Sequence, residues 1–302
     1  MEIITPSAGA VVALEPVVSL GRGMPAPQTA ARAMSLLEAN CNVPHALAVA
    51  GGTAAVFSCP SPGKETPNED AAMVVELTPQ HAVLVVADGL GGHASGEHAS
   101  RLAIQALRQA LLPLEIDPLD TNADALRWAI LAGIEEANRA VLELGTGAAT
   151  TLAVVEVQGS TVRPYHVGDS EILITGQRGR VKLQTICHSP IGYAVEAGLI
   201  AADDAIHHEE RHVISNVIGS ATMRIELGPA VTLAARDTVL IASDGLFDNL
   251  LQQEIVDGIR TGPLHDSLGR IVAEARQRMI EPREGLPSKP DDLTVVAYRR
   301  MA

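Results

Sequence analysis

Carboxylate side chains stand at the tips of several apolar segments of this sequence. The run Val239-Leu240-Ile241-Ala242 is apolar enough for a buried strand, and Asp244 follows it closely. A carboxylate there is partly desolvated, and an unpaired buried charge is costly. A single such aspartate is more simply explained as a helix cap or a turn residue. The arrangement recurs, mostly without a basic neighbour, at Asn68-Glu69-Asp70, Asp88-Gly89, Gly168-Asp169-Ser170, Ser243-Asp244-Gly245 and Asp291-Asp292.

Hard divalent cations would account for this set of carboxylates. Mg²⁺ and Mn²⁺ prefer carboxylate and water oxygens as ligands. Glycines follow both Asp88 and Asp244, and a glycine lets the backbone approach a ligand closely. The spacing therefore predicts a metal site bridged by carboxylates, without indicating which reaction it serves.

Strands and helices that could position these residues come in groups rather than in strict alternation. Grouped strands and grouped helices favour an α+β fold of packed antiparallel layers over a doubly wound parallel sheet. Helical spacing of apolar residues predicts helices at 96–111 and 122–144, and Thr121 with Asp124 resembles a capping box. We expect strands at 83–87, 150–157, 161–168, 170–175, 180–186, 224–233, 237–243 and 292–299, a helical insert at 189–220 and a helical pair at 252–280.

The first part of the chain carries no residues to which we can assign chemistry. Ala30, Ala33, Met34 and Leu37 fall at helical spacing, so we expect a helix at 28–39. We interpret residues 1–48 as an N-terminal extension of unknown role and residues 49–302 as one catalytic domain.

The composition narrows the classes of partner and of compartment. The formal net charge is −14 at pH 7, and a uniformly acidic protein repels nucleic acid and anionic lipid. The sequence lacks both a signal-peptide pattern and an apolar run of about 18 residues that could span a membrane. Cys41, Cys59 and Cys187 are odd in number and form no CxxC pair, which argues against disulfides and zinc. We therefore expect a cytoplasmic monomer that binds neither nucleic acid nor membrane.

Six motifs, taken in order, resemble those of the bacterial type 2C metal-dependent serine/threonine protein phosphatases over about residues 50–300. The segment Asp88-Gly89-Leu90-Gly91-Gly92-His93 is the most specific of them. The others are Asn68-Glu69-Asp70-Ala71, Gly147-Ala148-Ala149-Thr150-Thr151, His166-Val167-Gly168-Asp169-Ser170, Ala242-Ser243-Asp244-Gly245-Leu246 and Asp291-Asp292-Leu293-Thr294-Val295-Val296.

The resemblance implies a four-layer α-β-β-α sandwich of two antiparallel sheets flanked by helices. It also implies hydrolysis of phosphoserine and phosphothreonine in phosphoproteins, with a serine/threonine kinase as the opposing enzyme. Two Mn²⁺ or Mg²⁺ ions would activate water and neutralise charge on the phosphoryl oxygens. By motif, Asp88 would bridge the two ions, with the Gly89 carbonyl as a further ligand. Asp70 would help hold the second ion, with Glu69 acting beside it largely through water. Asp244 and Asp291 would complete the first ion, and Asp169 would serve a third, weaker position.

Several positions depart from the family pattern. Glu65 stands where an arginine usually grips the substrate phosphate, so we expect Lys64 or the distant Arg211 to supply that contact. Leu90 occupies the position of a proposed general acid, which leaves His93 as a candidate proton donor or as a residue that steadies its loop.

Two further departures change the charge near the predicted metals. Asp292 replaces an asparagine and either alters metal affinity or is a solvated neighbour. Glu171 replaces an arginine, which we interpret as a surface change.

The segment 187–220 corresponds to the mobile flap of the family, where we expect substrate selection. It contains a cluster of histidines and glutamates that could bind a transition metal, but their irregular spacing favours a solvated loop: His188, His207, His208, Glu209, Glu210 and His212. Two alternatives to a protein phosphatase remain at this stage: a binding or regulatory module without turnover, and a hydrolase of a small phosphorylated metabolite.

Overall fold

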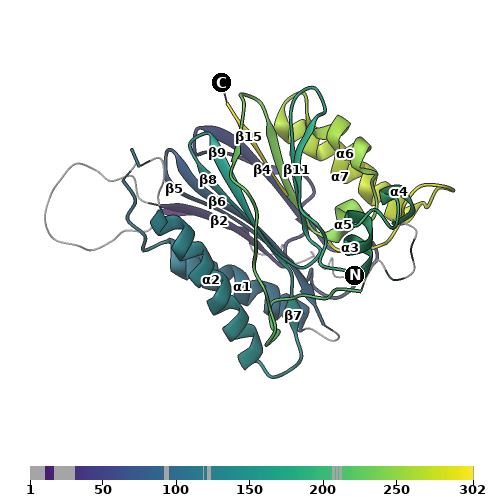
Figure 1. Cartoon of the computed structure of the whole chain (residues 1–302), viewed down its shortest axis with the longest axis horizontal. Helices are drawn as coiled ribbons and strands as arrows, with labels where there is room; N and C mark the ends of the chain where they lie inside the picture. The colour runs from purple at the N-terminus through teal and green to yellow at the C-terminus, as the bar shows by residue number, and fades with distance from the viewer. Residues whose placement is uncertain are drawn as a thin grey trace, which may run out of the picture.

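Two antiparallel sheets lie face to face, and helices cover the outer face of each (Figure 1). The computed structural model describes residues 11–16, 31–91, 95–117, 119–120, 124–205, 208, 210 and 213–301. Helix α1 (Gly96–Leu111) packs on β5 (Asp70–Thr78) and β6 (His81–Leu90) of one sheet, and helix α7 (Leu264–Ile280) packs on β4 (Gly52–Cys59) and β15 (Leu293–Arg300) of the other. This is the four-layer α-β-β-α sandwich that the motifs led us to expect.

The first sheet is the larger of the two, and β5 and β6 lie at its centre. Its main path runs β1 (Val11–Pro16), β2 (Arg32–Leu37), β5 (Asp70–Thr78), β6 (His81–Leu90), β8 (Leu152–Gln158), β9 (Thr161–Val167) and β12 (Glu226–Leu227). Two short strands join it at the side: β7 (Ala149–Thr150) pairs with β6, and β13 (Val231–Thr232) pairs with β9.

The second sheet has β14 and β15 at its centre. Its strand order is β11 (Val181–Gln184), β10 (Glu171–Thr175), β14 (Thr238–Ala242), β15 (Leu293–Arg300), β4 (Gly52–Cys59) and β3 (His45–Val49). All the pairs are antiparallel, so the beginning of one strand lies beside the end of its neighbour.

The helices form two groups on the outer faces and a third group near one end of the sheets. On the first sheet lie α1 (Gly96–Leu111) and α2 (Asp124–Glu143), and on the second lie α6 (Gln252–Ile259) and α7 (Leu264–Ile280) (Figure 1). The short helices are α3 (Pro190–Glu196), α4 (Ala202–Ala205) and α5 (Asp244–Phe247). In the described part of the chain no helix is both apolar and long enough to cross a bilayer.

The central strands are buried on both faces, and their side chains divide between two cores. Side chains alternate across a strand, so Ala72 and Val74 of β5 point into the core between the sheets, while Met73 and Val75 pack against α1 and α2. The same alternation holds along β6. It places Asp70 and Asp88 on the face that looks toward the other sheet.

Most of the expected elements are confirmed, including α1 with its predicted bounds. The helix expected at 28–39 is wrong. Residues 32–37 form strand β2, whose backbone pairs with β5, and this long-range pairing overrides the local helical spacing. The predicted domain boundary after residue 48 falls inside β3, and residues 32–37 and 45–49 form strands of the two sheets. A separate extension before them stays a prediction.

Candidate active site

Asp70 and Asp88 lie side by side on neighbouring strands. Asp70 begins β5, Asp88 lies near the end of β6, and the two are direct partners in the antiparallel register. Opposed residues in such a pair have Cβ atoms about 4.5–5.5 Å apart. Both side chains point into the gap between the sheets, so two carboxylates converge there.

The second sheet brings its own aspartates to the same end of the sandwich. Asp244 starts α5 just after β14, Asp291 lies just before β15, and these two strands are paired. The ammonium of Lys289 lies 2.5 Å from Asp244 Oδ2 and 3.0 Å from Asp291 Oδ2. It also lies 3.2 Å from Asp248 Oδ2. One lysine thus gathers three carboxylates of this sheet.

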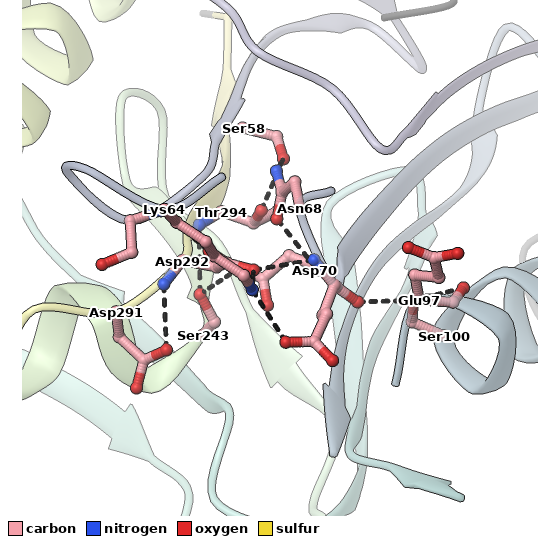
Figure 2. A network of polar contacts seen from close by, with 12 residues as sticks. Ser58, Lys64, Asn68, Asp70, Glu97, Ser100, Ser243, Asp291, Asp292 and Thr294 are labelled. Carbon is pink, nitrogen blue, oxygen red and sulfur yellow. Dashed lines mark hydrogen bonds and ion pairs between the residues drawn. The ribbon is translucent and has the colours of Figure 1, made fainter. Parts of the chain in front are cut away.

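A serine joins the two halves of the site across the gap between the sheets. Ser243 Oγ donates to Asp70 Oδ2 at 2.8 Å and accepts from the Thr294 backbone N–H at 3.0 Å (Figure 2). Asp70 belongs to the first sheet, and Ser243 and Thr294 belong to the second. The position of Asp70 relative to Asp244 is therefore fixed by a bonded contact.

Asn68 holds the chain in place just before Asp70. Its Oδ1 accepts from the Asp70 backbone N–H at 2.9 Å, and its Nδ2 donates to Ala39 O and Ser58 Oγ, each at 2.8 Å. Asn68 and Ser58 are both buried, so this turn is fully tied into the sandwich (Figure 2). The arrangement explains why the Asn-Glu-Asp segment is a defined structure rather than a solvated loop.

Glycine is required beside both central aspartates. A Cβ on Gly89 would lie 2.2 Å from the Gly96 carbonyl oxygen, and one on Gly245 would lie 2.0 Å from the Asp292 carbonyl oxygen. No backbone atom tolerates such a contact. The two Asp-Gly pairs therefore allow the start of α1 and the loop before β15 to close tightly on the site.

The threonine-rich segment fixes the backbone around Asp88. The Thr151 N–H and the Thr150 hydroxyl both donate to the Asp88 carbonyl oxygen at 2.8 Å, and the Asp88 N–H donates to Thr151 Oγ1 at 3.0 Å. Thr151 Oγ1 also lies 2.6 Å from Ser170 Oγ. This contact connects Asp88 to the loop that carries Asp169.

The electrostatics of the site favour bound cations. Burial, followed by the charges of Asp70, Asp244, Asp169 and Asp291, raises the pKa of Asp88 well above its ordinary value. The pKa of Asp70 rises to about 8, mainly through burial and then through Asp292. Buried oxygens without a hydrogen-bond partner among the described residues include Oδ1 of Asp70, Asp169 and Asp244.

These oxygens are the ligands that hard divalent cations prefer. Five aspartates with one neighbouring lysine carry excess negative charge that two cations would neutralise. The donor set therefore fits the predicted metal site. Glu69, whose backbone carbonyl accepts from Gly89 N at 3.2 Å, lies at its edge.

Asp292 is part of a buried ion pair. Its side chain is 4% exposed and accepts from the Ser61 and Glu69 backbone N–H groups at 2.8 and 2.7 Å. Lys64 Nζ lies 2.6 Å from Asp292 Oδ2 and 2.7 Å from Glu69 Oε2. The alternative of a solvated Asp292 is therefore wrong, because three donors surround its carboxylate. A phosphate contact by Lys64 stays a prediction, and two carboxylates already engage its ammonium.

Glu171 is not a surface residue, contrary to the prediction from sequence. It lies on β10 with 9% of its surface exposed, since its neighbours on β11 and in the loop before α3 cover it. Gln184 Nε2 donates to Glu171 Oε2 at 2.6 Å. Burial raises the pKa of Glu171 to about 7, against the opposing effects of Gln184 and Cys187.

His188 is also buried, so the expectation of a solvated histidine in the flap is wrong for this residue. Its Nδ1 accepts from Gly168 N at 3.0 Å and from Asn216 Nδ2 at 2.9 Å, and Nε2 lies 3.0 Å from Glu226 Oε2. The backbone of Arg224 fixes the orientation of the Asn216 amide: the Arg224 N–H donates to Asn216 Oδ1, and Asn216 Nδ2 donates to the Arg224 carbonyl oxygen.

The proton of His188 therefore sits on Nε2. His166, His188 and Glu226 have potential ligand atoms within 4.8 Å of one another, yet metal binding through Nε2 would require loss of that proton. His93 and Arg211 lie outside the described residues, as do His207, Glu209 and His212.

Sequence reasoning missed several residues that shape the site. Lys289 pairs with three of its carboxylates and Ser243 bonds to Asp70, but a lone lysine or serine in a sequence carries no signal of such a role. The Ser-Asp-Gly and Lys-Pro-Asp-Asp segments place both beside predicted ligands, which is the one clue available.

Comparison with known proteins agrees with this geometry. Residues 63–279 match the family model described as Protein phosphatase 2C. Protein phosphatase PhpP of Streptococcus pneumoniae is 29% identical over 219 residues, which are 69% of this chain and 85% of that protein.

Solved structures are similar over most of the sandwich. The serine/threonine phosphatase of S. agalactiae superposes with a TM-score of 0.68 at 27% identity, covering 82% of this chain and 98% of that one. The catalytic domain of serine/threonine protein phosphatase PstP, solved in complex with two manganese ions, gives a TM-score of 0.64 at 25% identity with the same coverage. With the family model matched over most of its length, the chain belongs to the protein phosphatase 2C family of metal-dependent serine/threonine phosphatases.

Proposed function

We propose that Asp70, Asp88, Asp244 and Asp291 hold two divalent cations, Mn²⁺ or Mg²⁺, for the hydrolysis of phosphoserine and phosphothreonine in proteins. The observation that carries this assignment is the convergence of carboxylates from both sheets on one gap, with buried oxygens of Asp70 and Asp244 lacking a partner among the described residues. Two bound cations supply a water activated near neutral pH and neutralise the charge of the phosphoryl oxygens.

The protein's own residues give this site its geometry. Asp88 is the register partner of Asp70, and the charges of Asp244, Asp169 and Asp291 also act on it, so it is the candidate for a ligand that both cations would share. Its main chain is held by Thr150 and Thr151, and the missing side chain of Gly89 lets the backbone after Asp88 pass close to the start of α1. Asp169, whose Oδ1 has no partner among the described residues, is the candidate for a third, weaker cation.

Two other parts of the proposal concern the setting of the enzyme. A phosphoprotein substrate implies a serine/threonine kinase that makes it, and we propose such an opposing kinase. Free, buried Cys41 and Cys59 suit a reducing compartment, so we also propose a cytoplasmic location and a monomeric enzyme.

Mutation of the central ligands tests the assignment. Asp88→Asn and Asp244→Asn keep the side-chain shape but remove a charge that holds metal, so each is expected to abolish Mn²⁺-dependent hydrolysis of a phosphothreonine peptide while unfolding stays cooperative. Asp257→Asn, on the exposed face of α6, is the control and is expected to keep full activity. Wild-type turnover by either site variant refutes the ligand assignment.

Two outcomes would favour other functions. If the wild-type protein binds Mn²⁺ in calorimetry but hydrolyses neither p-nitrophenyl phosphate nor the peptide, it is a binding module. If it hydrolyses small phosphorylated metabolites much faster than phosphopeptides, the protein substrate is the wrong assignment.

A further inference from the structure

A cavity of about 330 Å³ adjoins the predicted metal site. It lies between α3 of the flap and the segment that carries α5 and the start of α6. Asp169 and Asp244 form part of its wall, so a substrate whose phosphate sits at the metals can extend into it. Nothing in the ligand assignment accounts for the rest of this cavity.

The cavity wall combines apolar surface with carboxylates. Ile191, Val195 and Phe247 supply apolar area, and Glu171, Glu196 and Asp248 supply acidic groups. Of the described residues that line it, none is a lysine or an arginine. A ligand complementary to this wall has an aliphatic body and a positive charge at its end.

Glu171 is a buried acidic group of this wall whose hydrogen-bond partners among the described residues are all neutral. It is buried at the wall, and its partners among the described residues are the neutral Gln184 amide and the neutral Cys187 thiol. By contrast, the buried carboxylates of Asp237 and Asp292 each have a lysine partner. A buried carboxylate is stabilised most by a cation that also donates hydrogen bonds.

Cations bound at the metal site would not neutralise the acidic groups in the outer part of this cavity. They would neutralise Asp169 and Asp244, while Asp248 shares Lys289 with two other aspartates. Glu171 and the exposed Glu196 on α3 then remain as negative groups facing the cavity. The charge pattern therefore selects for a positive group beyond the phosphate.

We propose that this cavity binds the side chain of an arginine or lysine that lies near the phosphorylated residue of a protein substrate. The inference rests on the proposed phosphatase function and adds to it a preference for phosphorylation sites with a basic neighbour. The aliphatic stem packs against the α3 and α5 side chains, and the charged head reaches Glu171. A long basic side chain can bury its stem in this way while its head is solvated or paired.

Peptide hydrolysis tests this preference directly. The substrate is an otherwise uncharged phosphothreonine peptide with one arginine placed in turn at each position within four residues of the phosphothreonine, and its reference carries glutamine there. We expect arginine at one or two positions to raise kcat/KM roughly tenfold, mainly through KM, which is the effect of one hydrogen bond between charged groups.

Two variants and a control identify the cavity as the cause. Glu171→Gln is expected to remove most of the arginine preference. Gln252→Lys adds a positive charge at an exposed lining position of the cavity, where folding is not at risk, and is expected to do the same. Asp257→Asn is expected to leave the preference unchanged. Turnover of p-nitrophenyl phosphate, which has no peptide side chains, reports the metal site separately.

The outcomes distinguish failure of the basic-residue pocket from failure of the proposed phosphatase function. Equal rates for arginine and glutamine peptides, with normal p-nitrophenyl phosphate turnover, overturn the basic-residue pocket and leave the phosphatase intact. An arginine preference that survives in both Glu171→Gln and Gln252→Lys also overturns it. Absence of any Mn²⁺-dependent turnover by the wild-type protein overturns the proposed function, and the pocket falls with it.

Discussion

Lys289 places a positive charge where the predicted cations must bind, so its removal is expected to have opposite effects on metal-free stability and metal affinity. Its ammonium contacts three carboxylates within 3.2 Å. Burial alone would lower the pKa of Lys289, but the charges of Asp244, Asp248 and Asp291 outweigh burial and raise it. In the metal-free protein the lysine therefore acts as the counterion of this half of the site.

The size of the effect follows from these contacts. A hydrogen bond between charged groups contributes about 1.5–3 kcal/mol, and the Lys289 side chain is 25% exposed, so solvent screening brings the expected value toward 1–2 kcal/mol. Lys289→Met keeps most of the aliphatic stem and removes the charge. We expect the metal-free variant to lose about 1–2 kcal/mol of stability and to bind Mn²⁺ about 5–30-fold more tightly.

Urea unfolding without metal and calorimetric titration with Mn²⁺ measure the two effects. Lys182→Met is the matched control, because Lys182 is similarly exposed and pairs with the buried Asp237 away from the metal site. The control is expected to lose stability without a gain in Mn²⁺ affinity. Unchanged or weaker Mn²⁺ binding by Lys289→Met would show that its ammonium does not compete with the cations.

Two further predictions concern the same end of the sandwich. Asp169→Ala is expected to lower phosphatase activity less than Asp88→Asn does, and an equal loss in steady-state assays contradicts a third, weaker cation position. His166 is buried, and burial together with His188 lowers its pKa to about 3, so the unfolded chain takes up a proton below about pH 6.5 that the folded protein rejects. That contribution to stability decreases as the pH falls from about 6.5 toward 3, by about 2 kcal/mol at pH 5. His166→Leu should flatten the change in urea stability between pH 7 and pH 5, and an unaltered slope counts against this reasoning.

The convergence of the aspartates could be predicted because antiparallel pairing is a simple geometric rule. Asp70 begins β5 and Asp291 precedes β15, whereas Asp88 lies near the end of β6 and Asp244 follows β14, contrary to the expectation that all lie where strands end. In an antiparallel pair the start of one strand meets the end of the next. The acidic tips therefore gather at one end of the sheets, whichever side of a strand each one occupies.

Strand β2 could not be predicted in the same way. Ala33, Met34 and Leu37 suit a helical face as well as a strand, and local spacing alone does not separate the two. The deciding interaction is the pairing of Arg32–Leu37 with β5, whose partner residues lie about forty positions further along the chain. A backbone pairing between residues so far apart in the sequence cannot be detected from the spacing of apolar residues within a dozen positions.

The departures from the family pattern near Lys64 are explained together by one rearrangement of charge, in which Lys64 pairs with Asp292. Asp292 in place of asparagine adds a negative charge beside Asp70, and Lys64 supplies a positive charge 2.6 Å from it. The pair is buried at Asp292 and only 19% exposed at Lys64, so Lys64 offsets part of the negative charge that Asp292 adds beside Asp70. The same pairing keeps the ammonium between Asp292 and Glu69, which opposes its use as a grip on the substrate phosphate. Electrostatic stabilisation of the phosphoryl group would therefore fall mainly to the cations that we propose the aspartates hold.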